Sequence, residues 1–422
     1  MPPLESLGVL QAVELLARRE ITAQALVAAC LHRIAAEEPR VQAWEHLDPE
    51  RTLAQARAAD ADPRPPLYGL PVGIKDIIDT ADFPTECGST IHHGRRPTHD
   101  AACVAALRSA GAVILGKTVT TEFAVYTPGR TRNPRDAAHT PGGSSSGSAA
   151  AVGAEMIPAA LGTQTAGSVI RPASFCGVFG FKPTFGRLSM EGIHPLAPSL
   201  DTLGVFTRAL EDLPVLLRAL GLSLDVAPLT RPPRVGLWRT AMWGLASPAT
   251  QQTIENAVRA LAAAGAAVRD VELSVECAGL AEAQATIMAV EAASSLKPER
   301  TGHADALSAR LRALLDEGAA TPPARAQAAR ALADRGRRRA AELFTEVDVL
   351  LTPSAAGEAP PSLESTGDPA FNRIPTLLGL PCLNVPGATG PHGLPLGIQL
   401  VGPVGGDAAL LGAAAWVAQH LR

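Results

Sequence analysis

Apolar residues recur with a helical period over the first 60 residues of the chain. Between residues 23 and 35 they fall on one helical face: Leu26, Val27, Cys30, Leu31 and Ile34. Thr22 precedes this run, where a hydroxyl side chain caps a helix well. The pattern therefore predicts a helical N-terminal segment over residues 1–60.

From Pro66 onward, short apolar runs alternate with glycine and proline. The runs LYGLPVGIKDIID, AVILGKT and VFGFKPT are typical of buried strands followed by turns. Helical stretches are predicted between and after them, over residues 101–110, 148–154 and 209–222. This alternation predicts an α/β core.

Residues 233–345 have a different texture. They begin with one predicted strand (Val235–Leu237) and continue into Ala- and Arg-rich helices such as 250–264 and 324–344. Strand-like runs return at 347–351 and 396–401. We therefore expect one domain over residues 1–422, in which 233–345 is a helical insertion or cap.

The composition is globular, with 46% hydrophobic and 18% charged residues among 422. A net charge of −4 and 4% aromatic residues give no reason to expect a nucleic acid or membrane partner. The N-terminus lacks the apolar run of a signal sequence, so we expect a cytoplasmic protein. The cysteines are expected to be reduced and buried: Cys30, Cys87, Cys103, Cys176, Cys277 and Cys382.

Two short motifs match known site patterns in the wrong context. Residues 111–118 match the phosphate-binding pattern G-x-x-x-x-G-K-[ST], but the apolar run 113–115 favours a buried strand over a phosphate-cradling loop. Residues 143–147 match the G-x-S-x-G elbow, which would make Ser145 a nucleophile. That elbow needs a preceding strand, and the segment before it is polar and broken by proline.

Four histidines raise the question of a metal site. His92, His93, His99 and His139 lack the spacing of a helical metal site and have no neighbouring cysteine pair. We therefore interpret them as loop histidines and expect neither a metal nor a cofactor.

Lys75 is unusual because it lies inside the apolar run GLPVGIKDIID. Burial of a lysine disfavours its charged form, so a lowered pKa would make it a neutral base. The alternative is a lysine paired with Asp76 or Asp79 at a strand end. On Lys75 alone both interpretations stay open.

Two small-residue segments complete the candidate chemistry. TPGGSSSGSAAAV contains Ser144, and its alternative interpretation as a flexible linker is disfavoured by the apolar helix that follows. LGTQTAGSVIRPASFCGVFGFKPT contains Ser168 after two small residues, where open backbone N–H groups can form a nest for an oxyanion.

On these motifs the sequence resembles the amidase signature family from about residue 5 to 415. Further matches are SLDTLGVFTR and GLPLGIQLVG, and Ser144 and Ser168 stand at the family's spacing of its two catalytic serines. The run GTQTAGSVIRPA and the short length are most similar to the bacterial malonamidase type. Gln164 and Ala166 replace the family's commoner Asp and Gly, which disfavours an amidotransferase subunit.

The resemblance implies a fold and a set of roles. The fold is a single α/β domain with a large mixed twisted sheet covered by helices on both faces. Ser168 would be the nucleophile, Ser144 a bridging serine reached through a cis peptide after Gly143, and Lys75 the neutral base. The backbone N–H groups of residues 165–168 would form the oxyanion hole: Thr165, Ala166, Gly167 and Ser168.

The resemblance also suggests residues around the substrate. Arg171 would bind a substrate carboxylate, or alternatively would only hold backbone carbonyls of its loop. Thr163 is expected to support the loop of Ser168. Tyr126, His194 and Asn372 are expected to line the pocket.

The predicted reaction is hydrolysis of a carboxamide through an ester on Ser168. A serine hydroxyl needs a base to attack an amide, and Lys75 would serve through Ser144 and then return the proton to the leaving amine. Three alternatives stay open: a hydrolase of carbamates, ureas or aryl amides, an amidotransferase subunit working in a complex, and an inactive binding relative. The sequence decides neither the substrate nor whether the chain is a homodimer.

Overall fold

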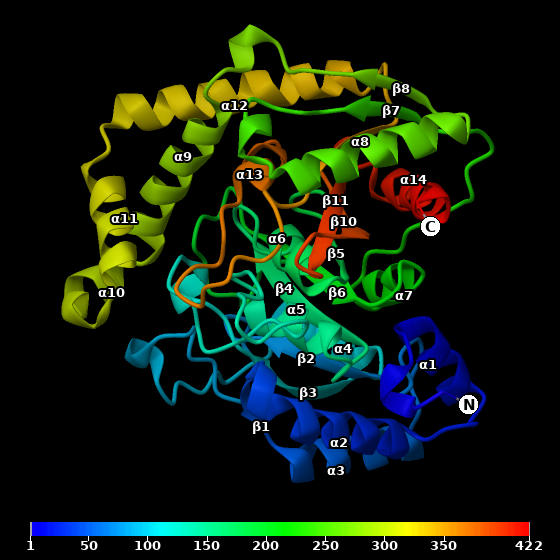
Figure 1. Cartoon of the computed structure of the whole chain (residues 1–422). Coiled ribbons are helices and arrows are strands. Elements are labelled where there is room, and N and C mark those ends of the chain that lie inside the picture. The colour runs from blue at the N-terminus through cyan, green and yellow to red at the C-terminus, as the bar shows by residue number, and fades with distance from the viewer. Residues whose placement is uncertain (1, 422) are drawn as a thin grey trace.

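One eleven-stranded mixed β-sheet forms the centre of the computed structural model, which describes residues 2–421 (Figure 1). The strand order is β1-β3-β2-β4-β6-β5-β10-β11-β9-β7-β8. The strands are β1 (Trp44–Leu47), β2 (Pro71–Lys75), β3 (Val113–Thr118), β4 (Ala159–Gln164), β5 (Phe179–Lys182), β6 (Thr202–Thr207), β7 (Arg234–Leu237), β8 (Ala267–Asp270), β9 (Val349–Pro353), β10 (Cys382–Thr389) and β11 (Pro395–Val401).

Helices cover both faces of this sheet, which confirms the predicted single α/β domain (Figure 1). The α-helices are α1 (Val9–Ala17), α2 (Ala23–Val41), α3 (Pro49–Ala61), α4 (Ala102–Ser109), α5 (Ser146–Gly153), α6 (Ile170–Cys176), α7 (Asp212–Ala219), α8 (Pro248–Ala263), α9 (Leu280–Ser295), α10 (Lys297–Gly302), α11 (Ala309–Ala320), α12 (Pro323–Leu343), α13 (Ala370–Leu377) and α14 (Asp407–His420). Short 3₁₀ turns are η1 (Leu4–Ser6), η2 (Thr90–His92), η3 (Glu122–Ala124), η4 (Trp243–Leu245), η5 (Val275–Cys277) and η6 (Ala304–Ala306).

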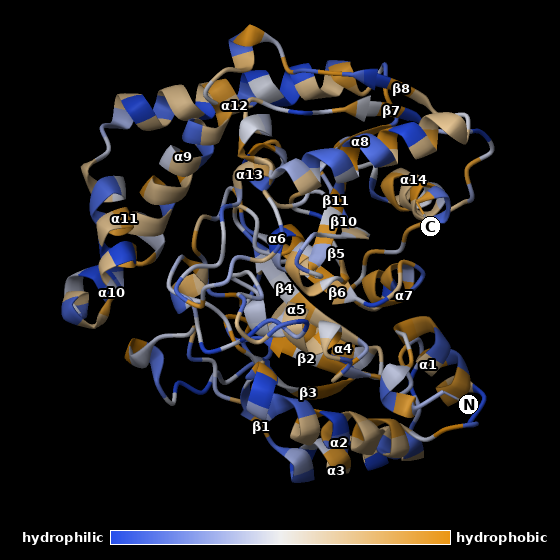
Figure 2. Cartoon of the chain, viewed as in Figure 1, coloured by the Kyte–Doolittle hydropathy of each residue, from blue (hydrophilic) through white to orange (hydrophobic). Residues whose placement is uncertain are grey.

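The candidate active site lies at the carboxyl ends of the parallel strands β3, β2 and β4. All their residues are buried, in keeping with the continuous apolar runs that central parallel strands require (Figure 2). β2 pairs with β4 in register through Ile74 and Leu161. The carboxyl ends of both strands therefore lie side by side, and Lys75 comes to stand beside Thr163.

Two fully buried helices pack on the sheet and on each other: α5 lies against β2, β3 and β4, and α6 lies against β5, β10 and β11. Small residues let α5 approach its neighbours. A side chain added at Gly147 would stand 2.2 Å from the carbonyl oxygen of Ala43 and 2.4 Å from the backbone nitrogen of Val119. The Gly/Ser-rich segment is thus a close-packed helix start and not a flexible linker.

The match to a phosphate-binding loop is a buried strand, as predicted. Residues 113–118 form β3, and the Lys117 ammonium lies 3.0 Å from the Asp76 carboxylate with both side chains fully buried. Lys117 also donates to the Thr85 hydroxyl at 2.6 Å. The Lys117 charge is therefore neutralised by Asp76 inside the core and is not available to bind a phosphate.

The predicted helical insertion contains more strand than its sequence pattern suggests. β7 and β8 pair in parallel and extend the central sheet beyond β9. Only α9, α11 and α12 pack mainly on one another away from the strands, at the upper left of Figure 1. The sequence pattern does not indicate β8 as a strand. Its residues are mostly exposed, because this edge strand has little apolar surface to bury.

The N-terminal segment also differs in detail from its prediction. It contains the edge strand β1, which pairs antiparallel with β3. α2 begins after Thr22 as predicted, and the Thr22 hydroxyl accepts a hydrogen bond from the Ala25 N–H at 3.0 Å. The helix continues through Pro39 to Val41, because Glu38 accepts from the N–H groups of Ala43 and Trp44 and ties its end to β1.

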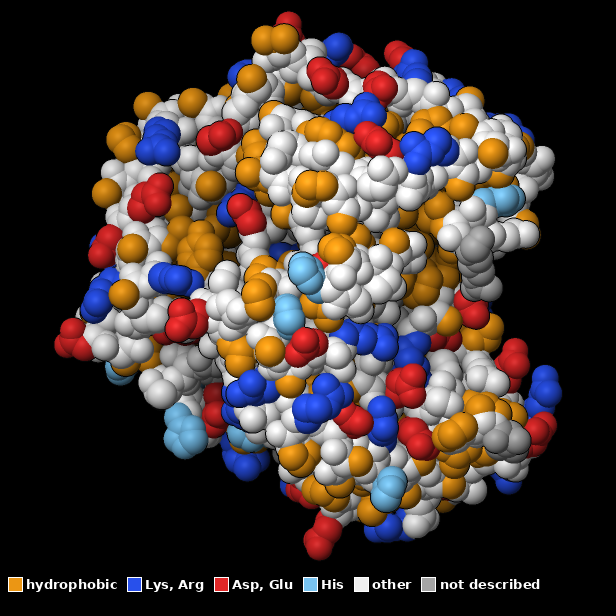
Figure 3. All heavy atoms as spheres, viewed as in Figure 1, with side chains coloured by type: hydrophobic (Ala, Val, Ile, Leu, Met, Phe, Trp, Pro, Cys, Tyr) orange, Lys and Arg blue, Asp and Glu red, His pale blue; other side chains and the backbone are white. Residues whose placement is uncertain are grey.

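The six cysteines are all buried and unbridged, as predicted. On the face seen in Figure 3, basic and acidic side chains are interspersed and form no single-sign field. Among residues 2–421, no helix combines the length and the apolar character needed to cross a membrane.

Candidate active site

A small cavity of about 60 Å³ lies at the edge where β2 and β4 end. Ser144, Ser168 and Arg171 line it, together with Tyr126 and residues 165–167. The structure therefore brings together residues from separate segments of the chain. The cavity has room for only a few non-hydrogen atoms of a ligand.

Lys75 is fully buried at the end of β2 and makes two hydrogen bonds. Its ammonium nitrogen lies 2.7 Å from Ser144 Oγ and 2.9 Å from Thr163 Oγ1. Burial lowers the pKa of Lys75 to about 7, because a charged ammonium is poorly solvated there. Near neutral pH a substantial fraction of this amine is uncharged and can accept a proton.

Lys75 does not form the ion pair of the alternative interpretation, because both nearby aspartates pair with other cations. Asp76 pairs with Lys117 at 3.0 Å, and Asp79 pairs with Arg95 at 2.7 Å. Among the described residues, no carboxylate lies within ion-pair distance of Lys75. Without such a partner, little offsets the cost of burying its charge.

Thr163 has a different position from the one expected for a loop support. Its hydroxyl accepts from Lys75, since β4 runs beside β2 and turns this side chain toward the lysine. Thr163 therefore contacts Lys75 directly.

Ser144 follows a cis peptide bond from Gly143, as the resemblance implies. The neighbouring Ser145, the nucleophile of the alternative elbow interpretation, is fully buried. Its hydroxyl donates to the Thr163 carbonyl and accepts from the Thr163 N–H, both at 3.2 Å. Ser145 is thus a structural link between α5 and β4, and it does not line the cavity.

The loop that carries Ser168 is held by Gln164. Its side-chain carbonyl accepts from the N–H groups of Val169 and Ile170 at 2.9 and 3.0 Å. Its side-chain amide donates to the Thr376 hydroxyl at 2.9 Å. Gln164, the last residue of β4, therefore caps the N-terminus of α6.

The front of this loop leaves backbone donors open to the cavity. Among residues 2–421, the N–H groups of the four predicted residues, Thr165, Ala166, Gly167 and Ser168, find no acceptor, as an oxyanion hole requires. The Ser168 hydroxyl lines the cavity and likewise has no hydrogen-bond partner within the described chain, and the same holds for the Thr121 hydroxyl.

Asp201 fixes the other end of the loop, a role that the sequence pattern did not reveal. Its carboxylate accepts from the Thr165 hydroxyl at 2.6 Å and from the N–H groups of Leu196 and Ala197. Burial raises the pKa of Asp201 to about 6, against the lowering effect of these hydrogen bonds. The motif SLDTLGVFTR placed this aspartate before β6, which pairs with β4, and the pairing could have indicated it.

Arg171 is buried and uses only one of its nitrogens on the protein. Its Nη2 donates to the Gly143 carbonyl at 2.6 Å and to the Thr366 hydroxyl at 3.2 Å. The Nε and Nη1 atoms are buried without any partner, although the side chain lines the cavity. Both interpretations of Arg171 therefore hold in part, since it supports the loop and also keeps two donors unused.

The cavity is electrically positive. Arg373 also lines it, held by a 2.7 Å hydrogen bond to the Gln284 side chain. Burial, with a further effect from Arg373, lowers the pKa of Arg171 to about 10, which leaves the guanidinium charged at neutral pH. Two cations in a small buried space favour an anionic ligand group.

Of the three predicted pocket residues, only Tyr126 lines the cavity. His194 lies beside His92 and Glu299, where the insertion meets the core. Asn372 lies behind the loop, because a side chain added at Gly167 would stand 2.5 Å from Asn372 Oδ1. Asn372 is thus placed to support the loop and not to contact a ligand in this cavity.

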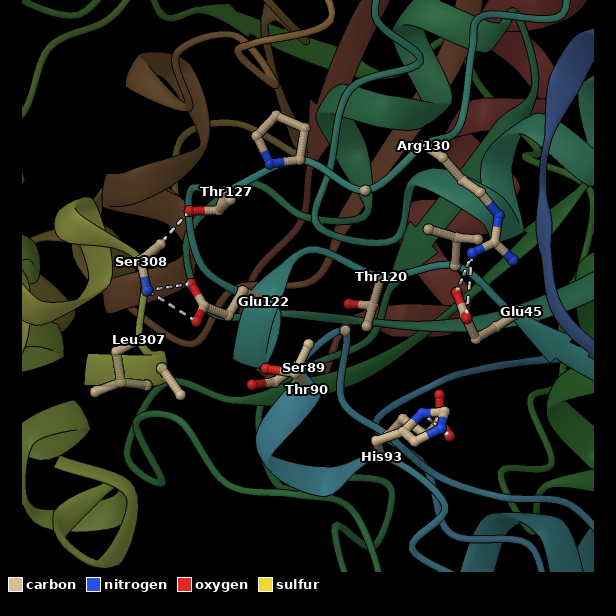
Figure 4. Close-up of a pocket in the computed structure, with 16 residues that line it drawn as sticks. Glu45, Ser89, Thr90, His93, Thr120, Glu122, Thr127, Arg130, Leu307 and Ser308 are labelled. Carbon is tan, nitrogen blue, oxygen red and sulfur yellow. Dashed lines mark hydrogen bonds and ion pairs between the residues drawn. The ribbon is translucent and has the colours of Figure 1, made fainter. Parts of the chain in front are cut away.

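A larger groove of about 520 Å³ borders the same segment, residues 119–129 (Figure 4). Glu45 and Arg130 form an ion pair there, and the Glu122 carboxylate accepts from the Ser308 N–H at 3.1 Å. This second contact ties the cavity wall to the start of α11 in the insertion. The groove holds no counterpart of the Lys75–Ser144 pair.

Comparisons with known proteins agree with this geometry. The family model described as Amidase matches residues 25–411. A glutamyl-tRNA(Gln) amidotransferase subunit of Roseiflexus castenholzii is 35% identical over 97% of this chain and 95% of its own length. A crystal structure described as an amidase superimposes with a TM-score of 0.92, at 31% identity over 99% of this chain and 100% of that one. The native peptide amidase of Stenotrophomonas maltophilia gives a TM-score of 0.85, at 30% identity over 100% and 98% of the two chains.

Proposed function

This chain belongs to the amidase family, and we propose that it hydrolyses a small carboxylate-bearing amide through an ester on Ser168. The family makes it a hydrolase of C–N bonds. The observation that carries the finer proposal is the buried Lys75, whose ammonium, among residues 2–421, hydrogen-bonds only to two hydroxyls, one of them on Ser144 in the cavity.

The first half of the reaction forms the ester. Uncharged Lys75 takes the proton of the Ser144 hydroxyl while Ser144 takes that of Ser168, once substrate binding brings the two serine hydroxyls, which share no hydrogen bond in this structure, into contact. The Ser168 oxygen then attacks the amide carbon. The negative charge that develops on the amide oxygen is bound by the open N–H groups of residues 165–168. The proton returns through Ser144 to the leaving nitrogen, the C–N bond breaks, and ammonia or an amine departs.

The second half returns the enzyme to its starting state. A water molecule gives its proton to the same relay and attacks the ester carbon. The carboxylic acid leaves, and Ser168 regains its hydroxyl proton. The residues named here supply both proton transfers, so the proposal requires no metal or organic cofactor.

The position of Arg171 favours a substrate that carries an acid group. Two of the guanidinium nitrogens, Nε and Nη1, have no acceptor among the described residues, so a substrate carboxylate can accept a charge-assisted hydrogen bond from one of them. The small cavity and the second cation, Arg373, favour the same choice. The two arginines at the small cavity, together with the resemblance of the Ser168 segment, support the malonamidase-like interpretation of the sequence.

Replacing the nucleophile provides the direct test. Ser168→Ala should lower kcat by about 10⁴-fold or more while leaving the far-ultraviolet circular dichroism and the melting temperature unchanged. Mass spectrometry of wild type quenched during turnover should find the acyl group on the peptide that contains Ser168. A normal rate in Ser168→Ala, or an acyl group on Ser145, would refute the assignment.

The pH profile tests the base. Because the uncharged form of Lys75 is the active one and its pKa is lowered to about 7, kcat/KM should rise with pH through about 7 and then level off. Lys75→Ala should lose roughly 10²–10⁴-fold in kcat and should lose this rise as well. Lys75→Arg keeps the charge but cannot give it up, so it should be equally inactive. A rise that persists in Lys75→Ala would assign it to another group.

A substrate comparison tests Arg171. Kinetics with malonamate, a neutral aliphatic amide of similar size, an aryl carbamate and an anilide should show a preference for malonamate. In Arg171→Met the ratio of kcat/KM for malonamate to that for the neutral amide should fall about 10–100-fold, as expected for a lost charge-assisted hydrogen bond. An equal loss on both amides would mean that Arg171 only supports the Gly143 carbonyl. A preference for the carbamate or the anilide would favour those alternative hydrolase classes.

The second candidate function is an amidotransferase subunit, which the similarity to the Roseiflexus protein favours. It predicts a stable partner protein and poor amide hydrolysis by the isolated chain. Size-exclusion chromatography of the purified protein, with an amidase assay across the peak, separates the two functions. Full turnover by the isolated chain supports the independent amidase, whereas activity that appears only after a partner is added supports the subunit.

A further inference from the structure

Three side chains of metal-binding types meet outside the catalytic cavity, although one of them lies far from the other two in the sequence. Cys87 and His92 come from the segment between β2 and α4, and His194 comes from the loop between β5 and β6. Their ligand atoms all lie within 4.8 Å of one another. Cys87 is fully buried, and only 16% of each of the other two side chains is exposed.

One ring nitrogen of His92 is free while the other is held. His92 Nε2 lies 3.1 Å from the Glu299 carboxylate of α10, and His194 Nε2 lies 3.9 Å from the same oxygen. His92 Nδ1 is buried without any partner, and so is the second carboxylate oxygen of Glu299. Buried polar atoms without partners are rare in folded proteins and indicate a missing binding group.

We propose that Cys87, His92 and His194 bind one borderline-soft divalent cation of the zinc class, with the Glu299 carboxylate orienting the His92 ring. A thiolate with two imidazoles suits zinc or cobalt, whereas magnesium and calcium prefer oxygen ligands. A metal-bound histidine commonly donates its other N–H to a carboxylate, the position that Glu299 occupies.

The spacing fits such an ion after small side-chain movements. Zinc lies about 2.3 Å from sulfur and about 2.0–2.1 Å from nitrogen, which sets tetrahedral ligand atoms roughly 3.5 Å apart. The cluster is already within 4.8 Å, so rotations of the three side chains would close it. Burial, reinforced by the nearby Asp76, raises the pKa of the Cys87 thiol, so the incoming ion must displace its proton.

The ion would tie together parts of the chain that form one wall of the cavity. Phe123 packs its ring against both histidines, at centroid distances of 5.2 Å from His92 and 5.3 Å from His194. Residues on either side of Phe123 line the catalytic cavity, and Glu299 belongs to the insertion. The cation would therefore stabilise the contact between insertion and core, and it takes no part in the amide chemistry.

The proposed site gives His92 a role beyond that of an ordinary loop histidine. Local ligand spacing does not reveal the site, because His194 is 102 positions beyond His92 in the sequence. The adjacent Glu86 and His93 face the other way, toward the larger groove, where His93 is 83% exposed (Figure 4). His93 is thus a matched control for His92.

Cobalt titration of the full-length protein tests the proposal. After removal of metals with a chelator, wild type should bind one equivalent of Co²⁺ and develop the near-ultraviolet charge-transfer absorption of a cobalt thiolate. Cys87→Ser should lose this absorption. His92→Ala and His194→Ala should each weaken Co²⁺ binding at least 10-fold, and Glu299→Gln should weaken it about 10–100-fold.

Control variants separate this site from other thiols and histidines. His93→Ala and Cys277→Ser should bind Co²⁺ as wild type does. A second readout covers any variant that folds poorly: Zn²⁺ should raise the melting temperature of wild type and of His93→Ala, but not that of His92→Ala. No thiolate absorption in wild type, or absorption that persists in Cys87→Ser, would overturn the proposal. Neither result depends on amide turnover, so the outcome is separate from that of the proposed function.

Discussion

The burial of one lysine without a counterion is the constraint on which the rest of the site depends. Lys75 ends the central strand β2, and its ammonium meets only the hydroxyls of Ser144 and Thr163. The nearest acidic neighbour in sequence, Asp76, is engaged by Lys117. Because Lys75 is buried and no described carboxylate pairs with it, part of its amine is uncharged near neutral pH. A lysine must be uncharged to accept a proton as a base.

The loop around Ser168 shows how open donors can be kept inside a folded chain. Backbone N–H groups without acceptors are costly when they are buried, so they persist only where other contacts hold the loop in place. Gln164 holds the start of α6, Asp201 holds Thr165, and Asn372 packs behind Gly167. The front of the loop is thereby left free for an oxyanion, while the back is held by these side chains.

The insertion reaches the cavity directly. Met288 of α9 lines it, and the Gln284 side chain donates to the Thr165 carbonyl at 3.0 Å. Two further contacts meet the segment that walls the cavity: the Glu122 carboxylate accepts from the N–H of Ser308, the N-cap residue of α11, and Phe123 lies against the histidines that meet Glu299 of α10. Changes in the insertion can therefore alter the shape of the cavity, although Lys75, Ser144 and Ser168 all belong to the core.

Local pattern determined much of this protein from its sequence. Apolar runs and their spacing predicted the α/β core, the strand at 113–118 and the helix capped by Thr22, because strand and helix periodicity depend on neighbouring residues alone. The family motifs identified Lys75, Ser144, Ser168 and Arg171, which the cavity and its surroundings bring together. Tertiary structure decided what depends on distant partners. β8 is a strand because β7 lies beside it, and Thr163 meets Lys75 because β4 pairs with β2. His194 lies beside Cys87 and His92 instead of in the cavity, since side chains 102 positions apart meet only when the chain is folded.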